Sequence, residues 1–253
     1  KSSAALSIFA SVFEESLEVD VAADTDEDDG SSDATCEVAE LYMKRYPEKM
    51  ILLRNRENRG LNYTLNRCLK AAKGKYIARM DGDDICLPER FAAEYETLET
   101  EKTISIVSTD MGYFDQTGIW GKISHPEYPK KKDFLYGSPF CHAPCMVRKE
   151  AYDAVAGYTE KKSILRVEDY HLWIKMYAKG FKGMNLQEPL YSMRDDRNAQ
   201  GRRKFKYRLN EAYVKKVAIK ELGLKKRNYV WCLRPIIIGL LPGSLYRILH
   251  RKK

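Results

Sequence analysis

Alternating strand-like and helical segments over the first two-thirds of the chain limit the folds that it can adopt. Residues 6–13, 50–53 and 104–107 are short apolar runs typical of strands. A helix is predicted over residues 61–73, where apolar residues recur at helical spacing and Gly74 provides a C-terminal stop. Strands separated by helices of this length favour right-handed crossovers. We therefore predict an α/β fold with a mostly parallel central sheet flanked by helices.

The later part of the chain has a looser pattern. Residues 113–123 are predicted to form a hairpin, and residues 167–179 a helix. A long basic helix is predicted from about residue 203 to residue 222. We expect one main domain over residues 1–200 and a helical, basic C-terminal extension over residues 201–253.

The composition is that of a globular protein. The 253 residues include 44% hydrophobic and 32% charged residues, which argues against a disordered chain. No apolar stretch reaches the roughly 20 residues that a membrane-spanning helix needs, and no signal-peptide pattern opens the sequence.

The six cysteines contain no C-x-x-C pair, so we expect reduced thiols and a cytoplasmic location. The net charge is +8, and basic residues far outnumber acidic ones after Arg194, which implies an anionic partner.

An acidic motif, Asp81-Gly82-Asp83-Asp84, directly follows the strand-like run at residues 76–80. Neighbouring carboxylates repel one another unless a cation holds them, and Mg²⁺ or Mn²⁺ takes such oxygen ligands together with water and substrate phosphates. This interpretation makes the motif an anchor for a metal and a diphosphate. The alternative is an acidic turn leading into the helix that Pro88 opens. Taken alone, the motif leaves both interpretations open.

Two further acidic clusters occur where the pattern places strand ends. They are residues 28–33, with the sequence DDGSSD, and the pair Glu168-Asp169 at the start of a predicted helix. Ligands of open α/β sheets bind outside the carboxyl ends of the strands, so these clusters and the acidic motif can converge on one cleft. Such a cleft suits an enzyme that handles a nucleotide diphosphate.

Four segments occur in order along residues 28–194: DDGSSD, ENRGLNYTLNRCLKAAKGKYIARMDGDDICLPERF, GSPFCHAPCMVRKEAYDAVAGYTE and VEDYHLWIKMYAKG. This series resembles the family 2 glycosyltransferases, which have the Rossmann-like GT-A fold and make bacterial surface polysaccharides. The resemblance implies an inverting, metal-dependent transfer of a sugar from a nucleotide-sugar, most often a UDP-sugar, to a saccharide or lipid-linked saccharide. It also divides the main domain into a nucleotide-sugar half, about residues 1–110, and an acceptor half, about residues 111–200.

The resemblance assigns donor-side roles by position. Asp29 matches the residue that contacts the uracil, with Asp28 beside it, and Arg59 lies in the segment that approaches the base. Asp81 matches the first acid of the D-x-D motif, near ribose and metal. Asp83 matches the principal ligand of the Mn²⁺ or Mg²⁺ ion.

Acceptor-side roles follow in the same way. Asp169 matches the general base, with Glu168 as its neighbour, and His142 lies in a stretch that lines the acceptor side. Inversion needs one displacement, so a carboxylate must take the proton of the acceptor hydroxyl. The leaving group is a nucleoside diphosphate, so a metal that stabilises negative charge replaces a general acid. Residues 14–27 are too short for the helix and second strand of the family, so we expect this region to be truncated, rebuilt or lacking residues.

The C-terminal extension contains an apolar stretch at residues 229–242, which prolines interrupt and basic clusters flank at residues 225–227 and 251–253. This arrangement predicts an interfacial anchor that makes peripheral contact with the inner face of the cell membrane. The alternative is a tail that folds back onto the main domain or pairs with another subunit.

Two other functions compete with the glycosyltransferase interpretation. A nucleotidyltransferase of related architecture would carry a Gly-rich, basic signature after the first strand, which is not found. A noncatalytic module would use the basic extension to bind a membrane surface. Nucleic acid is not expected as a partner, because aromatic residues are not interleaved with the basic ones.

Overall fold

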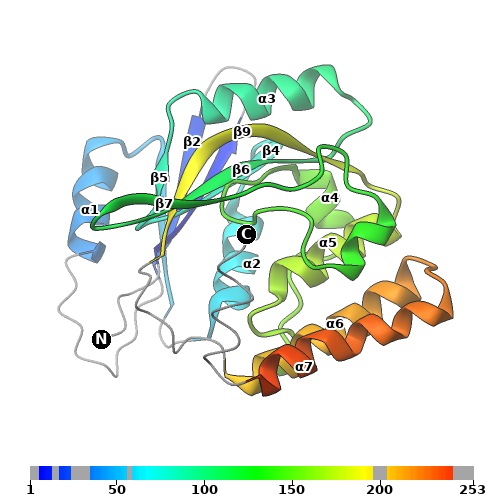
Figure 1. The fold of residues 1–253 in the computed structure, drawn as a ribbon. Coiled ribbons are helices and arrows are strands. Elements are labelled where there is room, and N and C mark those ends of the chain that lie inside the picture. Colours follow the sequence, from blue (N-terminus) through cyan, green and yellow to red (C-terminus); the bar gives the residue numbers. More distant parts are fainter. Residues whose placement is uncertain (1–5, 13–16, 24–34, 56–58, 196–203, 242–253) are drawn as a thin grey trace.

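A single mixed sheet with helices on both faces forms the main part of the molecule (Figure 1). The computed structural model describes residues 6–12, 17–23, 35–55, 59–195 and 204–241. Within these residues the strands are β1 (Leu6–Val12), β2 (Leu17–Ala23), β3 (Met50–Arg54), β4 (Tyr76–Asp81), β5 (Ile85–Cys86), β6 (Ile106–Asp115), β7 (Gly118–Ile123), β8 (Met146–Arg148) and β9 (Gly183–Arg194). The α-helices are α1 (Thr35–Arg45), α2 (Leu61–Ala71), α3 (Arg90–Thr100), α4 (Lys149–Ala154), α5 (Glu168–Ala178), α6 (Phe205–Glu221) and α7 (Leu233–Leu240). Three 3₁₀ segments are η1 (Lys131–Leu135), η2 (Lys162–Ile164) and η3 (Lys226–Cys232).

The strand order is β3-β2-β1-β4-β8-β6-β9-β5, with β7 paired to β6. Only the pairs β2–β3 and β6–β9 are parallel among the strands described, and the other pairs are antiparallel. The α/β class is confirmed, but the prediction of a mostly parallel sheet was wrong. For the pair β1–β2 the cause is the connection, since residues 13–16 are too few for a helical crossover and the two strands pair antiparallel.

Strand β2 lies within residues 14–27, of which the structure describes residues 17–23, and it pairs antiparallel with β1. The expectation that this region is truncated, rebuilt or lacking residues stays a prediction.

The side chains of the central strands point alternately to the two faces of the sheet, and this divides the core into two layers. Ile77 and Val147 belong to a cluster with α2, α4 and α5, whereas Tyr76 and Ala78 belong to a cluster with Leu98 of α3. Successive residues of a strand point to opposite faces of the sheet, so neighbouring residues of β4 enter different layers. Figure 1 accordingly shows α3 on one face of the sheet and α4 and α5 on the other.

Strand β9 was not predicted, although it connects the two regions that form the candidate site. It runs parallel to β6, with an irregular register between Thr109 and Met111, and its far end pairs antiparallel with β5. Its apolar pattern is interrupted by Asn185, Gln187, Glu188 and Pro189. Proline is tolerated in strands at such irregularities, so the sequence alone did not reveal the strand.

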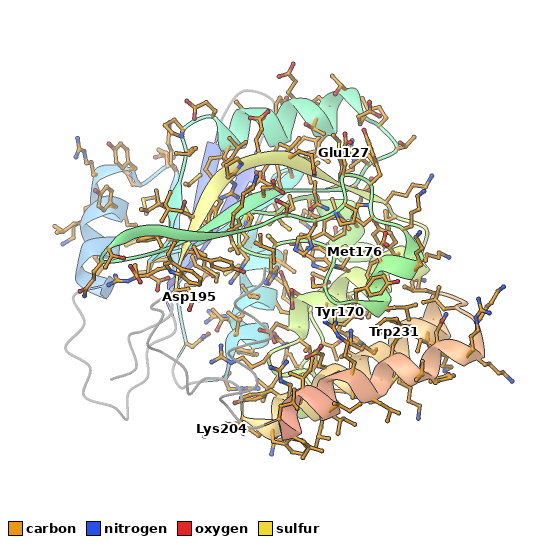
Figure 2. All side chains as sticks on the ribbon, viewed as in Figure 1. Glu127, Tyr170, Met176, Asp195, Lys204 and Trp231 are labelled. Atoms are coloured by element: carbon orange, nitrogen blue, oxygen red, sulfur yellow. The ribbon has the colours of Figure 1, made fainter. Side chains whose placement is uncertain are left out.

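The C-terminal extension folds back onto the main domain as far as residue 241. Helix α6 packs against α5, η1 and η2, and both η3 and α7 pack against α6. Buried Lys215 on α6 donates a hydrogen bond of 2.9 Å to the carbonyl of Leu135 on η1. Figure 2 shows Trp231 of the extension below Tyr170 of α5. No helix in the described part of the chain is both long and apolar enough to cross a membrane.

Candidate active site

The acidic motif forms a tight turn at the end of β4. The amide of Asp84 donates to the carbonyl of Asp81 at 3.2 Å, which closes the turn. The carboxylate of Asp81 is partly buried and forms an ion pair with Arg79, with 2.6 Å between Oδ1 and Nη2. The side chain of Asp83 is exposed. The turn thus presents one carboxylate to solvent and keeps another against a buried cation.

Asp84 has a different environment from the other two acids. Its Oδ2 accepts a hydrogen bond of 2.7 Å from the hydroxyl of Tyr191, and its Oδ1 accepts one of 2.8 Å from the amide of Arg194. Burial raises the pKa of the Asp84 carboxyl to about 6, and the charges of Asp81 and Asp83 add to this effect. Both of its oxygens have protein partners, so Asp84 serves as an attachment of the turn to β9.

The second acidic pair lies at the N-terminus of α5. Arg166 has a positive φ of 67°, which turns the chain into this helix. Burial raises the pKa of Asp169, whereas its own amide, that of Tyr170, the Ser138 hydroxyl and the charge of Arg79 oppose the rise. Burial and the neighbouring Asp169 raise the pKa of Glu168. The Oε2 atom of Glu168 is buried and has no hydrogen-bond partner among the described residues.

Arg79 interacts with an acid of each group, although we did not predict a role for it. It is 6% exposed and precedes Asp81 by two residues on β4, so both side chains leave the same face of the strand. Its charge lowers the pKa of both Asp169 and His142, in each case as a smaller effect than burial, which places all three groups in one electrostatic neighbourhood. Its Nε atom is buried without a partner in the residues described. An arginine inside an otherwise apolar strand was the available sequence signal.

His142 lies in the segment that connects η1 to β8, facing α5. Its Nε2 is 2.8 Å from the hydroxyl of Tyr158, and its ring packs edge-on against Trp173 with centroids 5.9 Å apart. Burial first, and the charge of Arg79 second, hold the pKa of His142 well below its usual range. The imidazole is therefore neutral near pH 7 and adds no positive charge to this neighbourhood.

The residues predicted to contact the uracil or lie near it form a separate set. Arg59 is exposed, and its guanidinium lies 4.4 Å from the ring centroid of Tyr63 at the start of α2. Asp28 and Asp29 lie outside the described residues. The structure thus brings together Asp81, His142 and Asp169 around Arg79. The assignment of Asp28, Asp29 and Arg59 to the uracil stays a prediction.

The chemistry of the acidic turn fits a hard divalent cation. Asp83 and Asp81 offer carboxylate oxygens, and Mg²⁺ in particular uses one or two carboxylates and completes its shell with water and phosphates. No cluster of three or more His, Cys, Asp or Glu side chains suitable for a metal occurs in the described part of the chain. A metal at this turn would therefore depend on oxygen atoms from a bound diphosphate.

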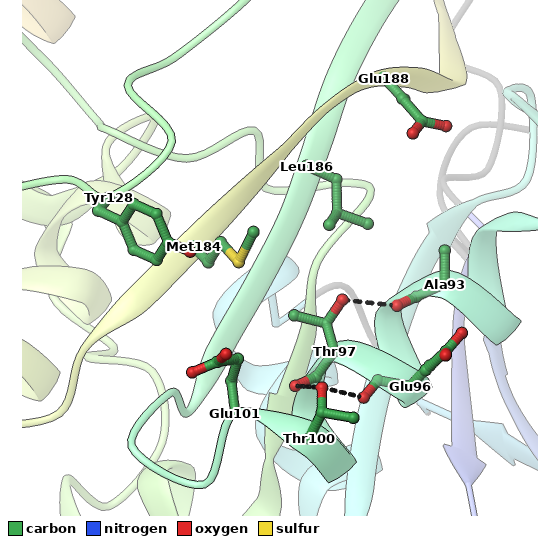
Figure 3. A pocket seen from close by; sticks show the side chains of 9 residues that line it. All are labelled: Ala93, Glu96, Thr97, Thr100, Glu101, Tyr128, Met184, Leu186 and Glu188. Atoms are coloured by element: carbon green, nitrogen blue, oxygen red, sulfur yellow. Dashed lines mark hydrogen bonds between the residues drawn. The ribbon is translucent and has the colours of Figure 1, made fainter.

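A surface hollow also lies between α3 and β9 (Figure 3). Its lining residues are Ala93, Glu96, Thr97, Thr100, Glu101, Tyr128, Met184, Leu186 and Glu188. None of them is a predicted site residue, so this hollow is separate from the neighbourhood of Arg79.

Comparisons with known proteins identify close and distant relatives. EpsE of Bacillus subtilis (strain 168) is 36% identical over 226 residues, which cover 89% of this chain and 81% of EpsE. WfaP of Escherichia coli, named as a UDP-Glc:alpha-D-GlcNAc-diphosphoundecaprenol beta-1,3-glucosyltransferase, is 27% identical over 81% of this chain and 77% of its own length.

The solved structures include S. aureus TarS in complex with UDP-GlcNAc, with a TM-score of 0.57 and 16% identity. The match covers 84% of this chain and spans 60% of that TarS chain. At this level of identity the likeness shows the fold alone, which is the GT-A fold.

The sequence model described as "Glycosyl transferase family 2" matches residues 28–156. This match contains the acidic motif and the segment of His142, and the similarity to EpsE extends over most of the chain. The glycosyltransferase interpretation is confirmed over the nucleotidyltransferase and noncatalytic alternatives. The relatives include the amylovoran biosynthesis glycosyltransferase AmsE of Erwinia amylovora, and the chain belongs to glycosyltransferase family 2.

Proposed function

We propose that this glycosyltransferase moves a sugar, with inversion, from a UDP-sugar to a hydroxyl of a saccharide or lipid-linked saccharide during synthesis of a cell-surface polysaccharide. The observation that carries the proposal is that the buried Arg79 guanidinium forms an ion pair with Asp81 while its charge also acts on Asp169. The names of WfaP, with its UDP-glucose donor and diphosphoundecaprenol acceptor, and of the TarS complex with UDP-GlcNAc support this donor and acceptor class.

On the donor side, Asp83 and Asp81 would hold a Mn²⁺ or Mg²⁺ ion. When bound, such an ion neutralises the charge that develops on the departing diphosphate. Asp83 is exposed and can reach a ligand directly, whereas Arg79 keeps the carboxylate of Asp81 in place. Asp28, Asp29 and Arg59 are proposed to contact the base and ribose.

On the acceptor side, Asp169 would take the proton of the attacking hydroxyl. A general base must be ionised before it reacts, and the charge of Arg79 together with the hydrogen bond from Ser138 favours the carboxylate against the cost of burial. Glu168 would assist from the adjacent position, and its unpartnered Oε2 can accept a hydrogen bond from a sugar hydroxyl. His142, which is neutral, would line the acceptor side.

The C-terminal extension is proposed to contact the membrane surface from the cytoplasmic side. Apolar side chains on η3 and α7 remain exposed although these segments pack against α6: Tyr229, Val230, Leu233, Ile237 and Leu240. Basic side chains lie in the same segments, including Lys226, Arg227 and Arg234. Exposed apolar groups beside cations match the chemistry of an anionic lipid surface. We propose residues 1–200 as the catalytic domain and residues 201–253 as this peripheral anchor.

The donor site is tested by calorimetric titration of UDP, with and without Mn²⁺. We expect UDP binding to depend on Mn²⁺ and to weaken at least about tenfold in Asp83→Ala. The reason is that losing a charged metal ligand costs more binding free energy than losing one neutral hydrogen bond. The control is Asp153→Ala, which removes an exposed carboxylate paired with Lys149 far along the chain. Metal-dependent binding that persists in Asp83→Ala would contradict the assignment.

The proposed base is tested with Asp169→Asn, which keeps the shape of the side chain. Transfer from UDP-sugars, followed as UDP release, should fall by about 10²-fold or more. Binding of UDP with Mn²⁺ should stay unchanged, since the proton is taken from the acceptor. Full activity in this variant would show that another group is the base.

Membrane contact is tested by sedimentation with vesicles that contain anionic phospholipid. The double variant Leu233→Glu/Ile237→Glu should stay in the supernatant, because both side chains are more than half exposed, at 53% and 58%, and would meet the lipid. Ile119→Glu is the matched control, since Ile119 is 73% exposed on the β7 hairpin. Equal pelleting of wild type and both variants would argue that the extension does not bind lipid through α7.

A further inference from the structure

One buried hydroxyl contacts both ends of the acidic turn. The amide of Asp81 donates a hydrogen bond of 3.1 Å to the Tyr191 hydroxyl, and the same hydroxyl donates one of 2.7 Å to the carboxylate of Asp84. These are the first and fourth residues of the turn. The other oxygen of Asp84 accepts from the amide of Arg194, three residues further along β9. The end of β9 thus holds the turn at three points.

The surroundings of Tyr191 make its own position well determined. The side chain is fully buried, at 0% exposure, in a cluster with Met111, Cys141 and Ala143. Its backbone lies opposite Cys86 in the antiparallel pair β5–β9, which directly follows the turn. The guanidinium of Arg90 lies 5.1 Å from its ring centroid. A buried aromatic ring packed on several sides has little freedom to move its hydroxyl.

Strand β4, which leads into the turn, is also held through Arg90, the residue that contacts the Tyr191 ring. Arg90 donates a hydrogen bond of 2.6 Å to the carbonyl of Arg79, and Arg79 forms the ion pair with Asp81. The turn is therefore attached through β4 on one side and through β9 on the other. Asp83 is the acid of the motif whose side chain is exposed, and its direction depends on the backbone of a turn that these contacts fix.

We propose that Tyr191 is a positioning residue, which acts through Asp84 and the amide of Asp81 to hold Asp83 and Asp81 in the geometry that binds a divalent cation together with a nucleoside diphosphate. This inference rests on the proposed donor site. Two ligands held in the correct geometry before binding give a higher affinity than ligands that must be ordered on binding. Loss of the hydroxyl should therefore reduce affinity at Asp83, although Tyr191 itself does not touch the ligand.

The test is Tyr191→Phe in the full chain, with Mn²⁺ affinity measured by the electron paramagnetic resonance signal of the free ion, in the presence of UDP. We expect an affinity about tenfold lower than in the wild type, the effect of losing hydrogen bonds to a charged group. The control is Tyr177→Phe. The buried hydroxyl of Tyr177 also accepts from an amide, that of Gly183 at 3.2 Å, and donates at 3.1 Å, to the carbonyl of Pro129. Tyr177 has no contact with the turn. The Tyr177→Phe variant therefore shows how the loss of two comparable buried hydrogen bonds affects stability without affecting the turn.

The outcomes separate this inference from the proposed function. A tenfold loss in Tyr191→Phe, with Tyr177→Phe unchanged in Mn²⁺–UDP affinity at a similar melting temperature, supports it. Equal affinity in Tyr191→Phe and wild type overturns it. Absence of Mn²⁺–UDP binding in the wild type overturns the proposed donor site instead. If Tyr191→Phe does not fold, Asp84→Asn decides by the same two criteria, since it keeps the side-chain size and removes the charge that the hydroxyl binds.

Discussion

The candidate active site depends on one buried cation, the guanidinium of Arg79 on the central strand β4. A buried charge is costly unless an opposite charge and hydrogen bonds compensate it. Asp81 supplies the opposite charge at 2.6 Å, and the guanidinium in turn favours the ionised form of Asp169. Because one cation acts on both carboxylates, the end of β4 and the start of α5 are coupled electrostatically as well as by packing.

Strand β9 contacts both the acidic turn and the segment that carries His142. Its last residues hold the acidic turn, and its first residue packs beneath the segment that carries His142. A Cβ atom at Gly183 would come within 2.4 Å of the Phe140 ring, so glycine is required for this close approach. Phe140 in turn packs against Trp173 of α5, with ring centroids 5.7 Å apart. One strand therefore links the turn, the His142 segment and the helix of Asp169.

The C-terminal extension also contacts the helix that carries Asp169, through Lys215 of α6. The ammonium group of Lys215 lies 5.6 Å from the ring centroid of Tyr170, next to Asp169, and bonds to the carbonyl of Leu135. Burial lowers the pKa of Lys215 to about 8, so its charge is retained at neutral pH at some cost. Under the proposed membrane contact, this docking would fix how the catalytic domain faces the lipid.

Local patterns in the sequence predicted much of the fold and part of the site. The helices at residues 61–73 and 167–179 correspond to α2 and α5, and the hairpin at residues 113–123 corresponds to β6 and β7. These elements follow from periodicity and turn chemistry within short windows. The acidic motif and the acid pair were also evident from residue types, and they lie at the ends of the elements where they were expected.

The sequence by itself determined the α/β class, the main helices and the family of the chain. The tertiary structure decided the mixed strand directions, the presence of β9 and the contacts of Arg79 and Tyr191 with the acidic turn. Strand direction depends on pairing between distant segments, which no local pattern records. The bond between Tyr191 and Asp84 joins residues 107 positions apart. Only folding brings such groups together, because the free energy that favours their contact comes from the burial of the strands that carry them.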